Sequence, residues 1–234
     1  MSEHTGFSYQ SIETSYAETV DLRPMNAYYE RPAMLSLLPD LLNKKVLDVG
    51  CGTGWYSEQL VGRGAQVTAF DLNQEFVRQT EQRLNQKAII LQADLSCPLT
   101  FARDRQFDLV ICPLVMHYLK SWQPVFDEFF RILKPGGILL FSTHHPFSDW
   151  KEFQKEDYFA LDLLEDEWDI GNVQFYRRPL SLMTSDLYES GFCIERIVEP
   201  QPTESFRQAR PEWYERLMKS PWFLIIRAHK LAAV

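Results

Sequence analysis

The chain has 234 residues, of which 45% are hydrophobic and 24% are charged, and its formal net charge is −8. A chain of this length and apolar content can bury the core of one large α/β domain. No run of about 18 apolar residues occurs, which excludes a membrane-spanning helix. The N-terminus lacks the basic start and apolar stretch of a signal peptide, so we expect a cytoplasmic protein.

The negative charge and the cysteine spacing exclude further classes. An enzyme that acts on RNA or DNA usually carries a basic face that neutralises phosphates, so a nucleic-acid partner is disfavoured. The four cysteines, Cys51, Cys97, Cys112 and Cys193, lie far apart and form no CxxC pair. This spacing fits neither a disulfide framework nor a zinc ribbon, so we expect free thiols and no metal.

Strands and helices are expected to alternate from Lys45 onward, after a polar arm and a helix that starts near Pro32. Asn73 fits a helix N-cap, and apolar residues recur at helical spacing over residues 121–134. The expected strands are residues 45–49, 66–70, 88–91, 107–113 and 138–142. Such alternation predicts a mostly parallel sheet with helices on both faces.

The alternation stops at residues 146–180, which are aromatic and acidic without a sustained period. A connection of this length is usually functional, so we predict a lid over the site. The pattern then resumes, with Gly191 as a helix C-cap and strands over 193–198 and 222–229. The expected organisation is one domain, 1–234, divided into an N-terminal helical cap (1–44), a core (45–145), the lid (146–180) and the C-terminal part of the sheet (181–234).

The segment VLDVGCGTGWY places Gly50, Gly52 and Gly54 directly after the first expected strand. Ligands of an open parallel sheet bind beyond the carboxyl ends of its strands. The dinucleotide fingerprint is G-x-G-x-x-G and a P-loop ends in Gly-Lys-Ser/Thr, whereas here G-x-G-x-G precedes Trp55. The loop therefore favours a ligand without phosphates, and a nicotinamide-dependent oxidoreductase is the weaker alternative.

Three acids lie in or near the carboxyl ends of the first three expected strands. Asp48 lies in the first strand, Asp71 ends the second, and Asp94 follows the third. A carboxylate after the second strand can accept both hydroxyls of a ribose, and it would repel a neighbouring phosphate. Asp94 is placed to receive an exocyclic amine. S-adenosylmethionine meets these demands, because it offers ribose and adenine without phosphates, and its sulfonium cation suits acidic surroundings.

Five segments together resemble the class I S-adenosylmethionine-dependent methyltransferases of the broad methyltransferase domain (type 11) family. The resemblance covers roughly residues 40–145, and five segments in order are far more specific than the glycine loop alone. It implies an α/β, Rossmann-like sheet of seven strands, the last of them antiparallel. The segments are Val46–Gly54, Val67–Leu72, Gln92–Leu95, Phe107–Tyr118 and Leu133–Ser142.

The same resemblance implies roles at the strand ends. The glycine loop would lie under the methionine part of the cofactor, Asp71 would bind the ribose, and Asp94 would contact the adenine amine. Pro113 departs from the family, because a polar residue is common at this strand end. The expected cofactor-binding residues are Asp48, Gly50, Cys51, Gly52, Gly54, Asp71, Leu72, Asp94, Leu95, Pro113, Leu114, Tyr28 and Arg31.

Three histidines are candidates for the general base of methyl transfer. His117 follows the fourth strand, and His144 and His145 follow the fifth. Histidine is the usual base near neutral pH. Alternation sends His144 and His145 to opposite sides, so at most one is expected to face the substrate. A zinc site of these histidines with Asp149 has no short-range ligand motif and is disfavoured.

The cap and the lid supply candidates for acceptor binding. Tyr16 and Tyr29 in the cap, with Arg177 and Arg178 in the lid, are expected to contact the acceptor. Packing is the alternative for the tyrosines, and neutralising acidic residues 162–169 is the alternative for the arginines. We therefore expect an enzyme that methylates oxygen or nitrogen of a small, partly apolar molecule. The alternatives are methylation of protein or RNA, and a catalytically silent cofactor-binding protein.

Overall fold

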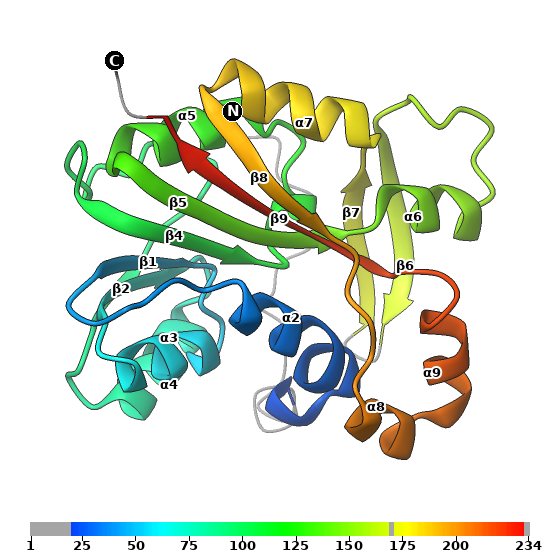
Figure 1. Cartoon of the computed structure of the whole chain (residues 1–234), viewed down its shortest axis with the longest axis horizontal. Coiled ribbons are helices and arrows are strands. Elements are labelled where there is room, and N and C mark those ends of the chain that lie inside the picture. The colour runs from blue at the N-terminus through cyan, green and yellow to red at the C-terminus, as the bar shows by residue number, and fades with distance from the viewer. Residues whose placement is uncertain (1–19, 169–170, 232–234) are drawn as a thin grey trace.

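Seven strands form one sheet in the order β3-β2-β1-β4-β5-β9-β8 (Figure 1). This computed structural model describes residues 20–168 and 171–231. β1 to β5 are parallel, and β9 runs antiparallel to β5 and β8, which confirms the predicted architecture. The strands are β1 (Lys45–Val49), β2 (Gln66–Asp71), β3 (Ile89–Gln92), β4 (Phe107–Pro113), β5 (Leu133–His144), β8 (Phe192–Val198) and β9 (Phe223–Lys230).

Alternate strand residues face two separate cores. In β1, Val46 packs on the side of α2 (Arg31–Ser36) and α3 (Trp55–Gly62), whereas Leu47 packs on the side of α5 (Gln123–Ile132) and α7 (Leu180–Glu189). α4 (Gln74–Leu84) lies beside α3 (Figure 1). Strands buried on both faces read as continuous apolar runs, and this explains why the central strands were recognisable in the sequence.

The fifth strand begins earlier than predicted. α5 ends at Ile132 and β5 starts at Leu133, so the KPGG segment expected to separate them lies inside the strand. Phe107 pairs with Leu133, but Leu109 pairs with Ile138, which leaves a bulge on β5. Gly136, at φ +73°, supplies the left-handed residue that such a bulge favours.

The segment predicted as an irregular lid contains regular structure. Residues 146–180 form α6 (Pro146–Glu152) and an antiparallel hairpin of β6 (Asp162–Trp168) and β7 (Gly171–Arg177). A small core of Leu164, Val173 and Phe175 holds this hairpin. Most other positions of β6 are acidic or exposed. The sequence of this strand therefore lacks the alternation of apolar and polar residues by which a half-buried strand is recognised.

Several elements gather beyond the carboxyl ends of the parallel strands (Figure 1). They are the π-helical turn Asn26–Glu30 (η3), α2, the β6–β7 hairpin, α8 (Glu204–Ala209) and α9 (Pro211–Leu217). α8 and α9 were not predicted. The longest described helix, α4, has 11 residues, and no helix within the described ranges is long and apolar enough to cross a membrane.

Candidate active site

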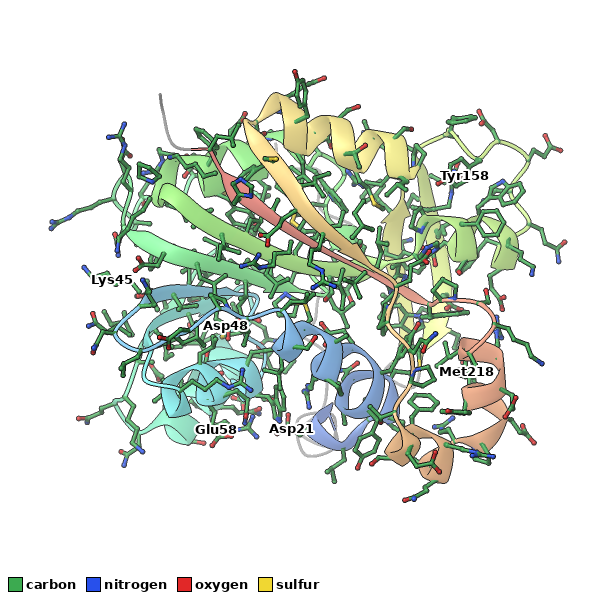
Figure 2. All side chains as sticks on the ribbon, in the orientation of Figure 1. Asp21, Lys45, Asp48, Glu58, Tyr158 and Met218 are labelled. Carbon is green, nitrogen blue, oxygen red and sulfur yellow. The ribbon has the colours of Figure 1, made fainter. Side chains whose placement is uncertain are left out.

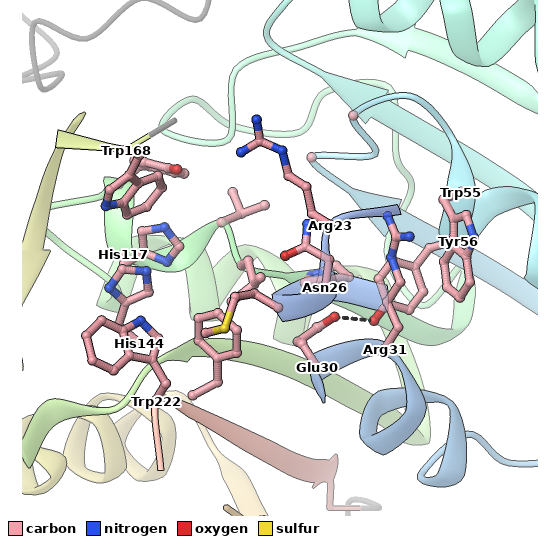
Figure 3. Close-up of a pocket in the computed structure, with 18 of the residues that line it drawn as sticks. Arg23, Asn26, Glu30, Arg31, Trp55, Tyr56, His117, His144, Trp168 and Trp222 are labelled. Atoms are coloured by element: carbon pink, nitrogen blue, oxygen red, sulfur yellow. Dashed lines mark hydrogen bonds between the residues drawn. The ribbon is translucent and has the colours of Figure 1, made fainter. Parts of the chain in front are cut away.

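A cavity of about 920 Å³ opens at the carboxyl edge of the sheet. Figure 3 shows its length: Trp55 and Tyr56 lie at one end, and His117, His144 and Trp168 lie at the other. Its floor is formed by residues that follow β1, β2, β3 and β4, and its walls come from the cap, the hairpin and the α8–α9 region. Ligands of open α/β sheets bind at this edge.

The glycine loop after β1 forms part of the floor. Gly52 has φ +54°, and a Cβ on it would meet nothing within 4 Å, so this residue leaves space above the loop. Gly54, at φ +84°, is needed for a different reason: a Cβ at this position would lie only 2.8 Å from Cγ2 of Thr80. Gly50, Cys51 and Gly52 line the cavity, whereas Gly54 packs against α4 and does not.

Asp71 at the end of β2 lines the cavity and shapes the glycine loop. Its Oδ2 accepts the main-chain N–H of Gly52 at 2.9 Å, and its Oδ1 accepts that of Asn73 at 2.9 Å. Burial raises the pKa of this carboxyl. The next strand end contributes Asp94, whose Oδ1 accepts from the main chain and hydroxyl of Ser96 at 2.8 Å. Leu72 and Leu95 also line this end.

Asp48 is a fully buried acid beneath the loop. Figure 2 shows the contrast within β1: Lys45 lies at the edge of the molecule, and Asp48 lies in its interior. Ser57 Oγ donates to Oδ2 of Asp48 at 2.6 Å, whereas Oδ1 has no partner within the described residues. Burial raises the pKa of Asp48 to about 7. An acceptor atom left without a donor suits a cationic ligand nearby.

Glu30 in the cap is a second buried acid, and the sequence analysis did not identify it. Ser142 Oγ donates to Oε1 at 2.6 Å. The hydroxyl of Tyr56 donates to Oε2 at 2.7 Å (Figure 3). The side chain lines the cavity although the residue is only 1% exposed. Burial raises the pKa of the carboxyl.

Arg31 also lines the cavity, as expected for a cofactor-binding residue. Its guanidinium lies 4.1 Å from the centre of the Trp55 ring. It donates to the main-chain oxygen of Asp21 at 2.9 Å and to its carboxylate at 3.3 Å. The fold therefore already holds this arginine in place on two sides.

The cap tyrosines lie elsewhere. Tyr29 is fully buried, and its hydroxyl accepts the main-chain N–H of Trp222 at 2.8 Å. Tyr28 packs in the same cluster, and its carbonyl accepts from Thr203 at 3.0 Å. Neither residue lines the cavity, so both act in packing the cap against the C-terminal helices. Tyr16 lies outside the described residues.

His117 and His144 stack at the far end of the cavity, with ring centres 4.3 Å apart and planes at 28°. Both are buried, and neither ring nitrogen of His117 has a hydrogen-bond partner within the described residues. Burial, with His144 and Arg178 nearby, lowers the pKa of His117 well below its usual range. Nδ1 of His144 lies 3.6 Å from Oδ1 of the buried Asp149.

His145 faces away from the cavity. It lies one residue beyond β5 and is the N-cap residue of α6, and its Nε2 lies 2.8 Å from Oε1 of Glu199. It does not line the cavity. Of the three histidines proposed as bases, the structure therefore brings two together and separates the third.

Arg177 and Arg178 do not reach the cavity, and the expected contact with an acceptor is not met. Arg177 donates to Asp162 at 2.6 Å and to three main-chain carbonyls within residues 157–160. The guanidinium of Arg178 lies 4.0 Å from the centre of the Trp122 ring, and each arginine is only 1% exposed. Arg177 thus ties β7 to β6 and to the segment before it, and Arg178 packs the end of the hairpin against the core residue Trp122.

Other cavity residues were missed because they belong to no motif. Trp55 and Tyr56 had a usable signal, since they directly follow the glycine loop. Arg216 had none: its guanidinium lies 4.9 Å from the Trp222 ring and 2.5 Å from the carboxylate of Glu152. The missed residues include Arg23, Asn26, Glu30, Trp55, Tyr56, Arg210, Arg216 and Trp222.

The chain is similar to known proteins in sequence and in fold. Residues 47–141 match the family model described as "Methyltransferase domain". An uncharacterized protein of Haemophilus influenzae is 28% identical over 232 residues, which are 88% of this chain and 89% of that protein. A ubiquinone biosynthesis O-methyltransferase of Psychrobacter cryohalolentis is 36% identical over 107 residues, so the match spans 44% of this chain and less than half (42%) of that relative.

A solved structure extends the likeness to most of the chain. The S-adenosylmethionine-dependent methyltransferase of Mesorhizobium loti superposes with a TM-score of 0.70 at 26% identity. The match covers 86% of this chain and 97% of that one. The likeness therefore includes more than the segment matched by the family model, which ends within β5.

Proposed function

Because the chain is a class I S-adenosylmethionine-dependent methyltransferase, we propose that it methylates oxygen or nitrogen of a small molecule bound at the His117–His144 end of the cavity. One observation carries this proposal. Two buried imidazoles with unpartnered nitrogens line the same cavity as Asp71 and Asp94. Polar groups buried in this way indicate a ligand that completes their hydrogen bonds.

The cofactor end fits S-adenosylmethionine. Asp71 would accept the ribose hydroxyls, Asp94 and Leu95 would contact adenine, and the loop at Gly52 would lie under the methionine part. The open space above Gly52 and the unpartnered oxygen of Asp48 support this assignment. When bound, the cofactor supplies a methyl group on a sulfonium, an electrophile that requires no activation by the protein.

His144 would act as the general base that takes the proton of the acceptor. Its Nδ1 lies near Asp149, so Nε2 is the nitrogen left to face the cavity. The carboxylate of Asp149 would stabilise the protonated ring, as an acid partner does in other histidine bases. His117, held neutral by burial, stacks on His144 and avoids placing a second positive charge 4.3 Å away.

The walls of the acceptor end favour a small, planar, partly apolar acceptor. The ring of Trp168 lies 5.5 Å from that of His144, and Trp222 and Tyr118 also line this end. Arginines and acids alternate around the cavity, so it does not present the basic groove expected for RNA. The O-methyltransferase relative supports an oxygen acceptor, although it matches less than half of this chain.

The first test combines methyl-labelled S-adenosylmethionine, the purified protein and a fractionated cell extract. Label in the small-molecule fraction would support the proposal and identify the acceptor by its mass. Label in protein or RNA would overturn the small-molecule assignment.

With the acceptor in hand, His144→Ala should lower turnover by about 10²–10⁴-fold, because a general base contributes that much. Affinity for the cofactor, measured by calorimetry, should stay unchanged. His145→Ala is the matched control, since His145 follows in sequence but lies outside the cavity, and it should keep turnover within a few-fold. Equal rates for the two variants would remove His144 as the base.

A further inference from the structure

Glu30 is an acid inside the cavity whose only hydrogen-bond donors are neutral hydroxyls. Ser142 and Tyr56 donate one hydrogen bond each, and no lysine, arginine or histidine among the described residues pairs with the carboxyl. The adjacent Arg31 is directed instead to Asp21 and Trp55. The carboxyl is 1% exposed, and Arg31 stabilises its charged form only through space, without a hydrogen bond or ion pair within the described residues. Because buried charges are normally paired directly, this arrangement is unusual.

The partners of Glu30 place it where the two ends of the cavity meet. Tyr56 belongs to α3, which follows the glycine loop directly. Ser142 belongs to β5, and its Oγ accepts the main-chain N–H of Leu114, a cavity residue after β4. In Figure 3, Glu30 lies between the Trp55–Tyr56 end and the His117–His144 end. A ligand that lies along the cavity between these two ends would therefore pass the carboxyl of Glu30.

The cofactor itself brings the missing positive charge. S-adenosylmethionine carries two cations close together, the ammonium of its amino-acid part and the sulfonium that holds the methyl group. Adenosine thioethers without the amino-acid part carry neither. The raised pKa of Glu30 agrees with this view, since a proton can compensate the buried carboxylate until a cation replaces it.

We propose that Glu30 binds the positively charged part of S-adenosylmethionine and selects it against uncharged adenosine thioethers. This rests on the proposed function only in its placement of the cofactor, between Asp71 and the histidines. It does not depend on the identity of the acceptor. Glu30 thereby gives the cap a direct part in binding, besides covering the site.

The test compares Glu30→Gln with the wild type by calorimetry for three ligands. These are S-adenosylmethionine, S-adenosylhomocysteine, which has the ammonium but no sulfonium, and 5′-methylthioadenosine, which has neither. Glutamine keeps the size of the side chain and an oxygen for one hydroxyl. We expect affinity for S-adenosylmethionine to fall by about 10- to 100-fold, because a charge-assisted contact is lost. Affinity for 5′-methylthioadenosine should stay within two-fold, which also shows that the variant is folded.

The second ligand identifies which cation is bound. A similar loss for S-adenosylhomocysteine would assign Glu30 to the ammonium, and an unchanged affinity would assign it to the sulfonium. Glu58→Gln is the matched control, an exposed acid on α3 that should change nothing. Equal affinity of wild type and Glu30→Gln for all three ligands would overturn the proposal, as would an equal loss for all three. Because the test measures only the binding of ligands, it can be carried out even if no acceptor is found.

Discussion

The two ends of the cavity bury ionisable groups in opposite chemical forms. At the cofactor end, burial raises the pKa values of Asp48, Asp71 and Glu30, which favours protonated carboxyls. At the acceptor end, burial lowers the pKa of His117, which favours a neutral imidazole. These shifts favour the uncharged form of each buried group when no ligand is bound. The two ends therefore offer different chemistry: the first offers carboxyls, and the second offers the neutral imidazole of His117.

The two ends also differ in how the chain builds them. The floor of the cofactor end comes from residues 48–95, within three consecutive strand ends. The acceptor end combines His117, His144, Trp168 and Trp222, which are brought together from four separate parts of the chain. The first arrangement follows from local motifs and parallel pairing. The second exists only when the hairpin and the C-terminal helices pack onto the sheet.

Among the variants that distinguish the two ends, Arg177→Met is expected to have the largest effect, a loss of stability confined to the hairpin. This change removes hydrogen bonds to Asp162 on β6 and to three main-chain carbonyls of residues 157–160, just before the hairpin. Losing one partner of a buried ion pair costs about 3–5 kcal/mol. Because Asp162 keeps some contact with solvent, we expect the lower end of that range. Hydrogen exchange of the β6 and β7 amides should show the lost protection, while cofactor affinity stays unchanged.

The control for this change is Arg78→Met, on the exposed face of α4. Arg78 pairs only with Glu75 one turn earlier, and such surface pairs contribute less than about 1 kcal/mol. The variant should therefore unfold like the wild type. If Arg177→Met weakened cofactor binding as strongly as it loosened the hairpin, the two ends would not be independent.

A smaller effect at the other end is expected from Asp71→Asn. The variant loses a charge-assisted contact with the ribose and weakens the acceptor for the Gly52 N–H. Binding of S-adenosylmethionine should weaken by about 1–3 kcal/mol, as measured by calorimetry. Asp108→Asn is the matched control, because Asp108 pairs with Lys134 away from the cavity. An Asp71 variant that binds as tightly as the Asp108 variant would refute the ribose assignment.

The smallest effect concerns the pH dependence of stability. Asp48 has a pKa of about 7 in the folded protein, against an ordinary value of 3.8 for the unfolded chain. The stabilising contribution of the bound proton is complete below pH 3.8 and is lost as the pH rises towards 7. One group can change the unfolding free energy by at most about 1.4 kcal/mol per pH unit.

Asp48→Asn removes this titration. Urea unfolding at pH 5, 6 and 7 should therefore show a shallower loss of stability in the variant, by about 1 kcal/mol per pH unit. Glu30 and Asp71, whose pKa values are also raised, account for part of the slope that remains. Parallel pH profiles for wild type and variant would show that Asp48 is ionised in the folded protein at all three pH values.

Of the cavity lining, the sequence predicted the acids at the ends of β2 and β3 closely, and the walls from the cap and the α8–α9 region poorly. Asp71 and Asp94 were recognisable because they follow strands that are apolar throughout, and parallel strands bring their ends to one edge. Arg177 was expected to bind an acceptor, and it proved to be buried against Asp162 and the carbonyls of residues 157–160, which lead into its hairpin. Glu30 was missed because it stands in no motif, and only packing places it against Ser142, 112 residues away.

The sequence by itself determined the parallel sheet, the glycine loop and the acids after the strands, because short-range periodicity and spacing dictate these features. It also limited the base to histidines near two strand ends, and it predicted that His144 and His145 would diverge. Only the tertiary structure decided that His144 is the one that faces the cavity and stacks on His117. The physical reason is that the acceptor end consists of contacts between distant segments, and such contacts depend on how whole elements pack rather than on any local pattern.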